Sequence, residues 1–168
     1  MRNAIPALNA DAMDKRRCQV TYTIHTPGTD EHSKEVTGKK EVIGQVSIRA
    51  KGTLPIAESL SIDDGPETGI LKMEIGYSLI TTAWSRGYAT EAVMATLSAF
   101  KRAESFWAPF KKIYIEAIVH PDNPASCRVL EKAGFRKVGL HEWEAERIVL
   151  AGALRENRVL VYGIWLVA

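Results

Sequence analysis

The sequence has few cysteines, no large excess of either charge and no long apolar run. Its two cysteines, Cys18 and Cys127, lie far apart and neither belongs to a C-x-x-C pair, which favours a reducing compartment over a disulfide framework. The four histidines are scattered without the spacing of metal ligands. We therefore expect no metal site.

The net charge is only +2, so nothing indicates a surface for nucleic acid or for an anionic membrane. No stretch is long and apolar enough to span a bilayer, and residues 1–17 do not resemble a secretory signal. With 46% hydrophobic and 25% charged residues, the chain has an ordinary globular composition. We expect one cytoplasmic domain over residues 1–168, with residues 1–17 as a short arm or helix.

The most informative stretch is residues 72–91, KMEIGYSLITTAWSRGYATE. Its first nine residues alternate as in a strand, a polar turn follows, and a helix is predicted from Arg86 to Glu104. The first N–H groups of a helix have no internal partner, and the helix dipole is positive there. Gly87 lets the backbone approach a phosphate closely, and Arg86 adds a fixed charge. This turn is therefore a candidate anion site, and the alternative is an ordinary strand–helix turn.

A second helix is predicted at residues 123–135, NPASCRVLEKAGF. Asn123 is a favourable N-cap, Pro124 suits the first helical position, and Gly134 suits a left-handed stop. Residues 113–119 are nearly all apolar, as in a strand buried on both faces. A strand, a long helix and a buried strand predict a right-handed crossover and parallel pairing.

The remaining elements are predicted from alternation and turn residues. Two early strands are expected to pair antiparallel, with Gly44 marking a bulge, and two late strands to form a hairpin whose last strand is central. Two long exposed connections separate the early elements. The expected strands are residues 18–24, 42–50, 136–146 and 158–167, and the expected connections are residues 25–40 and 51–70.

Two of these stretches carry a resemblance to a known family. Residues 84–92, WSRGYATEA, resemble the acyl-CoA pyrophosphate loop of the GNAT N-acetyltransferase superfamily, most closely its ribosomal-protein-alanine N-acetyltransferase branch. Gly87 and Ala89 match the pattern (Q/R)-x-x-G-x-(G/A), and Trp84 replaces its first residue, as is usual in that branch. Residues 123–135 resemble the family's N-x-x-(A/S)-x-x-(L/V)-x-E-K-x-G-F motif.

The resemblance implies an α/β fold of the GNAT type. Its sheet is mixed and mostly antiparallel, is flanked by helices, and contains a splayed parallel strand pair. Residues 1–17 are too few for the N-terminal strand and helices that usually begin such domains. The chain is therefore naturally short, trimmed or completed by another subunit, and a homodimer is left open.

The resemblance also implies an activity, an acetyl-CoA-dependent transfer of an acetyl group to a primary amine by direct attack in a ternary complex. The acceptor is a small molecule or a protein N-terminus. Main-chain groups near the end of the strand predicted at residues 72–80 would hold the pantetheine arm and the thioester oxygen, and the loop at residues 84–92 would hold the pyrophosphate. The implied cofactor contacts are Ser78, Leu79, Ile80, Arg86, Gly87, Tyr88, Ala89, Thr90 and Asn123.

Acyl transfer needs a neutral amine and a protonated leaving thiolate. Glu74, on the same strand face as Ser78, is the first candidate base, and its alternative role is an ion pair with Lys or Arg. Glu116 is a second candidate base, and water is a third. Many GNAT enzymes use a Tyr as the acid where this chain has Leu130.

In the branch, a Ser three residues after the Asn serves the thiolate, and here this is Ser126. Its hydroxyl equally suits a bond to the helix backbone. A covalent acyl group on Cys127 is disfavoured because no His–Asp pair accompanies this thiol. The second hypothesis is a non-catalytic acyl-CoA sensor module, which the missing Tyr favours.

Overall fold

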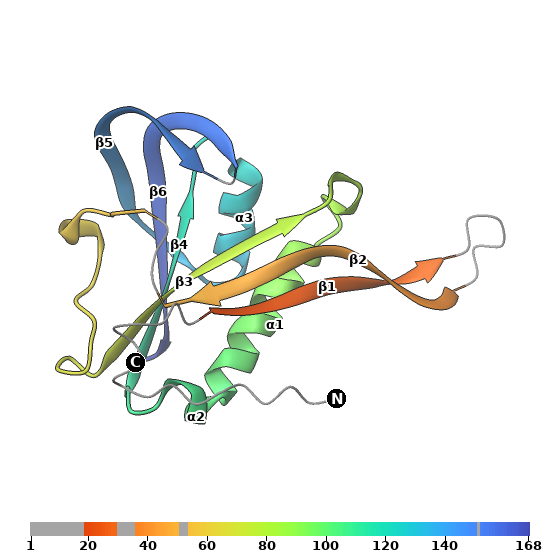
Figure 1. Ribbon diagram of the computed structural model, residues 1–168, viewed down its shortest axis with the longest axis horizontal. Helices are drawn as coiled ribbons and strands as arrows, with labels where there is room; N and C mark the ends of the chain where they lie inside the picture. The colour runs from red at the N-terminus through yellow and green to blue at the C-terminus, as the bar shows by residue number, and fades with distance from the viewer. Residues whose placement is uncertain (1–18, 30–35, 51–53, 151) are drawn as a thin grey trace.

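The computed structural model describes residues 19–29, 36–50, 54–150 and 152–168 (Figure 1). In these residues six strands form one mixed sheet in the order β1-β2-β3-β4-β6-β5, flanked by helices. The elements are β1 (Gln19–Thr29), β2 (Val36–Arg49), β3 (Ile70–Leu79), α1 (Tyr88–Arg102), α2 (Glu104–Trp107), β4 (Lys112–Val119), α3 (Pro124–Lys132), β5 (Arg136–Leu150) and β6 (Ala153–Val167), with short 3-10 turns η2 (Glu58–Leu60) and η3 (Thr81–Ala83).

Strands β3 and β4 are the parallel pair, as predicted, and every other neighbouring pair is antiparallel. Their pairing runs from Ile70 opposite Lys112 to Glu74 opposite Glu116 and then stops. Strand β3 nevertheless continues to Leu79, and β4 continues to Val119. The two strands therefore part at their carboxyl ends.

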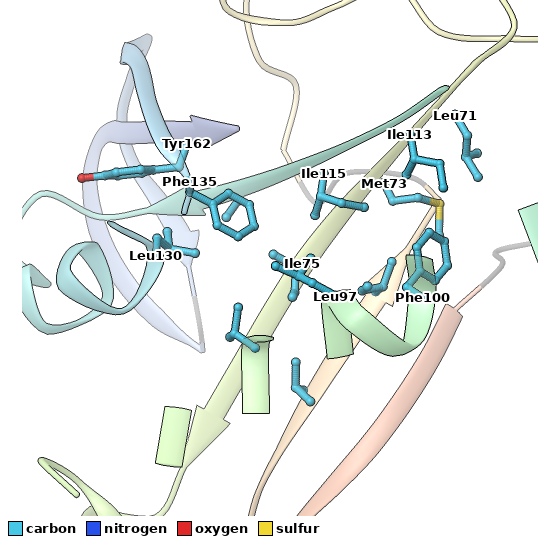
Figure 2. Packing of buried hydrophobic residues seen from close by; sticks show 14 of the residues in the cluster. Leu71, Met73, Ile75, Leu97, Phe100, Ile113, Ile115, Leu130, Phe135 and Tyr162 are labelled. Carbon is cyan, nitrogen blue, oxygen red and sulfur yellow. The ribbon is translucent and has the colours of Figure 1, made fainter. Parts of the chain in front are cut away.

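Helices α1 and α3 cover one face of the sheet. Met73 and Ile75 of β3 pack with Leu97 of α1, and Leu130 of α3 belongs to the same buried cluster. Figure 2 shows these side chains between the strands and the two helices. Each such side chain contributes roughly 1.5–3 kcal/mol when it is fully buried. This core fixes both helices relative to the parted strand ends.

The opposite face of the sheet is more polar. Alternation along β3 turns Lys72 and Glu74 away from the helices, and residues 54–69, which precede β3, contact this face through Ser61. Lys72 Nζ donates a hydrogen bond to Ser61 Oγ, and the ring nitrogen of Trp143 on β5 donates one of 3.0 Å to the Pro55 carbonyl. This segment is the long connection that the sequence predicts.

The predicted connection at residues 25–40 is wrong where the structure describes it. Strand β1 continues to Thr29 and β2 begins at Val36, because the two strands go on pairing beyond the polar residues. Cross-strand hydrogen bonds override weak local propensity here. The bulge at Gly44 is confirmed, since Ile24 pairs with Gly44 and the next residue pairs with Val42.

The helix expected from Arg86 begins at Tyr88 and ends at Arg102. The late hairpin is confirmed, with β6 between β4 and β5, but its strands are longer than expected and turn near Gly152. The expected arm or helix at residues 1–17 lies outside the described residues.

Candidate functional site

A cavity of about 460 Å³ lies where the end of β3 meets the starts of α1 and α3. All three elements come from the two stretches that the sequence singles out. The cavity is on the helix side of the parted strands. Its lining residues are Tyr77, Ser78, Leu79, Ala83, Trp84, Ser85, Gly87, Tyr88, Ala89, Thr90, Asn123, Ala125, Ser126, Arg128, Val129 and Lys132.

The start of α1 is open to the cavity. Gly87 is the N-cap residue and has a φ of 84°, in the left-handed region that favours glycine. No side chain caps the helix, so the first N–H groups lack the partner that an Asp or Ser cap supplies. A Cβ atom on Gly87 would meet no protein atom within 4 Å. The backbone here therefore leaves room for an anion.

The start of α3 is closed by its own cap. Asn123 Oδ1 accepts a 3.1 Å hydrogen bond from the Ser126 N–H, as the predicted N-cap requires. The Tyr77 hydroxyl donates a 3.2 Å hydrogen bond to the Ser126 carbonyl, and so joins β3 to α3. Burial raises the pKa of Tyr77, and the contact with Ser126 partly offsets this. At neutral pH the Tyr77 hydroxyl is therefore a donor.

The end of β3 directs main-chain groups, the Leu79 N–H among them, at the gap between the strands. The Ile80 N–H donates a 2.9 Å hydrogen bond to the Ile43 carbonyl of β2. Neighbouring residues of a strand direct their main-chain groups to opposite sides, so the Leu79 N–H points away from β2. The Leu79 carbonyl does so too, and it accepts a 3.0 Å bond from the Trp84 ring nitrogen.

Two carboxylates face each other on the other side of the sheet, at the last paired position before the strands part. Glu74 and Glu116 are register partners, and each is only 4% exposed. Arg49 forms an ion pair with Glu74, in which its Nε donates a 2.9 Å bond to Oε1. Glu116 Oε2 is buried and has no hydrogen-bond partner among the described residues. The two acids therefore have unequal surroundings.

Burial raises the pKa of Glu116, and the positive charge of Lys72 partly opposes this. The negative charges of Glu74 and Asp64 raise the pKa further. Tyr114, on the same strand face, has a raised pKa because of its burial and the nearby Glu116 charge. Glu116 is therefore a carboxyl group that holds its proton more tightly than usual.

The structure brings together most of the predicted cofactor contacts. Ser78, Leu79, Gly87, Tyr88, Ala89, Thr90, Asn123 and the catalytic candidate Ser126 all line the cavity. Ile80 and Arg86 do not line it, and Glu74 lies on the opposite face. Sequence reasoning did not single out four lining side chains as contacts, Tyr77, Trp84, Arg128 and Lys132. The spacing 125, 128, 129 and 132 on one helix face is the signal that could have found the last two.

Residues 10–136 match the family model described as an acetyltransferase (GNAT) domain. The chain belongs to the GNAT acetyltransferase family. The cavity thus lies on the two GNAT motifs, with the loop motif at the start of α1 and the Asn motif at the start of α3. No curated protein sequence matches the chain.

Several solved structures of acetyltransferases are similar to the chain. A ribosomal-protein-S5-alanine acetyltransferase from Vibrio fischeri is 21% identical, with 74% of this chain and 55% of that chain covered and a TM-score of 0.49. Mycobacterium smegmatis RimJ, in complex with CoA-disulfide, is 25% identical, with 74% and 48% covered and a TM-score of 0.46. The chain thus spans about half the length of these proteins. The family match, not these likenesses, identifies it.

Within the described ranges, no helix has the length and hydropathy that crossing a membrane requires. The same residues contain no group of three His, Cys, Asp or Glu side chains placed to hold a metal ion.

His120 is buried at the end of β4, where its Nδ1 accepts a 3.2 Å hydrogen bond from the Asp122 N–H.

Proposed function

We propose that this protein transfers an acetyl group from acetyl-CoA to a primary amine of a small molecule or a protein N-terminus, by direct attack while both substrates are bound. The observation that carries the proposal is the cavity in which an uncapped helix start, a left-handed glycine and a parted strand end meet. Membership of the GNAT family supports it, as does the loop resemblance at residues 84–92.

The residues present fit a CoA thioester. The N–H groups of Tyr88, Ala89 and Thr90 would bind the pyrophosphate, and the open space beside Gly87 admits its close approach. The cavity volume of about 460 Å³ is within the usual range of ligand pockets. Acetyl-CoA supplies the acetyl group as an activated thioester. The Leu79 N–H would donate to the thioester oxygen, and one such donor is typically worth about 2.7–4 kcal/mol in the transition state.

The carboxyl groups of Glu74 and Glu116, called the acid pair below, would take up the proton of the amine. A primary amine on lysine has a pKa near ~10.4, so it is mostly charged at neutral pH and must lose a proton before it attacks. Glu74 and Glu116 lie immediately before the point at which β3 and β4 part. Arg49 balances the charge of Glu74, and the second oxygen of Glu116 has no partner in the described residues. The Oε2 atom of Glu116 would then be available to accept the amine proton.

The leaving thiolate needs a hydrogen-bond donor on the cavity side that stabilises its charge until solvent protonates it. Ser126 lines the cavity in the first turn of α3, so its hydroxyl would donate a hydrogen bond to the sulfur. The position at which many GNAT enzymes have a Tyr is Leu130, which is fully buried in the core here. Ser126 is therefore the proposed donor.

The test combines binding with turnover. We expect acetyl-CoA to raise the melting temperature, and a screen of primary amines with detection of free thiol to reveal at least one acceptor. If CoA binds but no amine accepts the acetyl group, the chain is instead a non-catalytic acyl-CoA sensor. If neither occurs, the cavity is not an acyl-CoA site.

A further inference from the structure

The side chain of Tyr114, on β4, lies across the neighbouring strand β6 at Gly163. A Cβ atom on Gly163 would overlap the hydroxyl oxygen and the Cζ atom of Tyr114, and would lie 3.1 Å from its Cε2 atom. Glycine weakens the interior of a strand, because it has no side chain to pack and loses more conformational freedom on folding than other residues do. The position of the Tyr114 ring therefore requires a residue that β6 would otherwise disfavour.

This position is directly beside Glu116. Glu116 and Gly163 are register partners in the pairing of β4 with β6. Side chains of opposite residues project from the same face of a sheet, with Cβ atoms about 4.5–5.5 Å apart. The Tyr114 hydroxyl fills the place of a Gly163 side chain, so it is a close neighbour of the Glu116 side chain. The electrostatics agree, since burial raises the pKa of Tyr114 and the negative charge of Glu116 raises it further.

Tyr114 is in turn held by Trp165, its register partner on β6. The two rings pack edge to face with their centroids 5.1 Å apart. Trp165 is 44% exposed, whereas Tyr114 is only 7% exposed and Glu116 only 4%. Exposure to solvent thus falls from Trp165 through Tyr114 to Glu116. The aromatic pair forms the wall of the Glu116 site on the β6 side.

The other walls of this site carry charges. The charged groups that face Glu116 from neighbouring elements are Lys72 and Glu74 of β3, Asp64 in the connection before β3 and, through Glu74, Arg49 of β2. Burial is the largest cause of the raised pKa of Glu116, and the positive charge of Lys72 opposes it. The side chain that excludes water on the uncharged side should therefore matter most to the proton affinity of Glu116.

We infer that Tyr114 is a positioning residue for Glu116, that its ring keeps water from the carboxyl group on the β6 side, and that Gly163 admits the ring. A carboxyl group that is kept from water binds its proton more tightly. Under the proposed function, on which this inference rests, Glu116 takes up the amine proton. The ring of Tyr114 then sets the pH above which Glu116 is free to act as the base.

Direct titration of Glu116 tests the inference without requiring turnover. Glutamate carboxyl groups are labelled with ¹³C and titrated by NMR, and the Glu116 signal is assigned by its loss in Glu116→Gln. Tyr114→Leu removes the ring, Gly163→Ala forces it out of place, and Tyr114→Phe keeps the ring without its hydroxyl. Gly76→Ala is the matched control, since it adds the same methyl group to a glycine of β3 where the new Cβ atom would lie 3.5 Å from the closest atom.

We expect the midpoint of the Glu116 titration to move to lower pH, toward the usual value of 4.5, in both Tyr114→Leu and Gly163→Ala. Tyr114→Phe and Gly76→Ala should leave the midpoint close to that of the wild type. The double variant Tyr114→Leu/Gly163→Ala should move it no further than Tyr114→Leu does, because no ring is left to displace.

An unchanged midpoint in Tyr114→Leu would overturn the inference, and this variant decides even where Gly163→Ala fails to fold. An equal change in Tyr114→Phe would also overturn it, because the hydroxyl and not the ring would then be the cause. The acidic limb of the pH–rate profile should move to lower pH together with the midpoint. If the midpoint moves and the limb does not, the role of Tyr114 stands and Glu116 is not the base of the proposed reaction.

Discussion

The hydroxyl of Tyr77 donates a 3.2 Å hydrogen bond to the main-chain oxygen of Ser126, across the space between β3 and the first turn of α3. Tyr77→Phe removes this bond and leaves the ring. We expect the variant to lose roughly 0.5–1.5 kcal/mol of unfolding free energy, the usual net value of one hydrogen bond. Urea unfolding measures the change. An unaltered free energy of unfolding would mean that solvent replaces the bond fully.

Ser126→Ala is the complementary change, because it keeps the main-chain oxygen that Tyr77 contacts. We expect kcat to fall about tenfold, since water can partly replace a hydroxyl donor. Stability should change less than in Tyr77→Phe. Cys127→Ala, one position along the same helix, should be nearly silent. A dead Cys127→Ala protein, together with an acyl-enzyme in mass spectra, would refute direct attack.

Gly87→Val should abolish most of the stabilisation by CoA. A β-branched residue at a φ of 84° is strained, and its side chain would occupy the open space that a phosphate needs. At a CoA concentration of about 100 times Kd, the wild type should gain about 2.7 kcal/mol. Gly152→Val is the control, with a similar φ of 75° in the β5–β6 turn. A full CoA shift in Gly87→Val would count against the loop as the phosphate site.

Glu116→Gln and Glu74→Gln should each lower kcat by roughly 10²- to 10⁴-fold, the usual contribution of general acid–base groups. The CoA Kd should change little, because both carboxylates lie on the face opposite the cavity. The acidic limb of the pH–rate profile should disappear in Glu116→Gln. If neither substitution affects turnover of an accepted amine, solvent is the base and the acid pair is structural.

The stability of Glu116→Gln should depend on pH in a defined direction. Burial raises the pKa of Glu116 above its usual 4.5, despite the opposing charge of Lys72, so the folded protein holds this proton more tightly than the unfolded chain does. Its contribution to stability is complete below the unfolded pKa and is lost as pH rises through the folded pKa. Gln mimics the protonated acid, so the melting temperature of the variant relative to wild type should rise with pH. A difference that is independent of pH would show that Glu116 does not titrate in this way.

The sequence was sufficient to predict a secondary-structure element where its local residue pattern agrees with the strand pairing of the fold. Alternation in residues 72–80 and the apolar run at residues 113–119 predicted the parallel pair, and the cap at Asn123 predicted α3. The strand pairing of residues 25–29 with residues 36–42 was missed because these residues have weak strand propensity and are held by cross-strand bonds. Such bonds are visible only once the two strands are paired.

The sequence predicted the main-chain part of the candidate site better than the contacts of its side chains. The loop at Gly87 and the start of α3 line one cavity, as their motifs suggest. The Arg49 partner of Glu74 comes from a strand 25 positions earlier, so its identity could not be read from local spacing. Ile80 was among the expected cofactor contacts, and its N–H is donated to the Ile43 carbonyl, which only the pairing of β2 with β3 shows.

The parting of β3 and β4 has a consequence for the order in which the substrates come and go. The cavity opens on the helix side of the sheet, and the acid pair lies on the other side. Under the proposed function, the acyl donor and the amine would therefore enter and leave by separate faces, and neither would have to depart before the other could move. Double-reciprocal plots of initial rate against the concentration of either substrate should then intersect. Each product should inhibit by binding on its own side of the sheet, and the two products should be able to leave in either order.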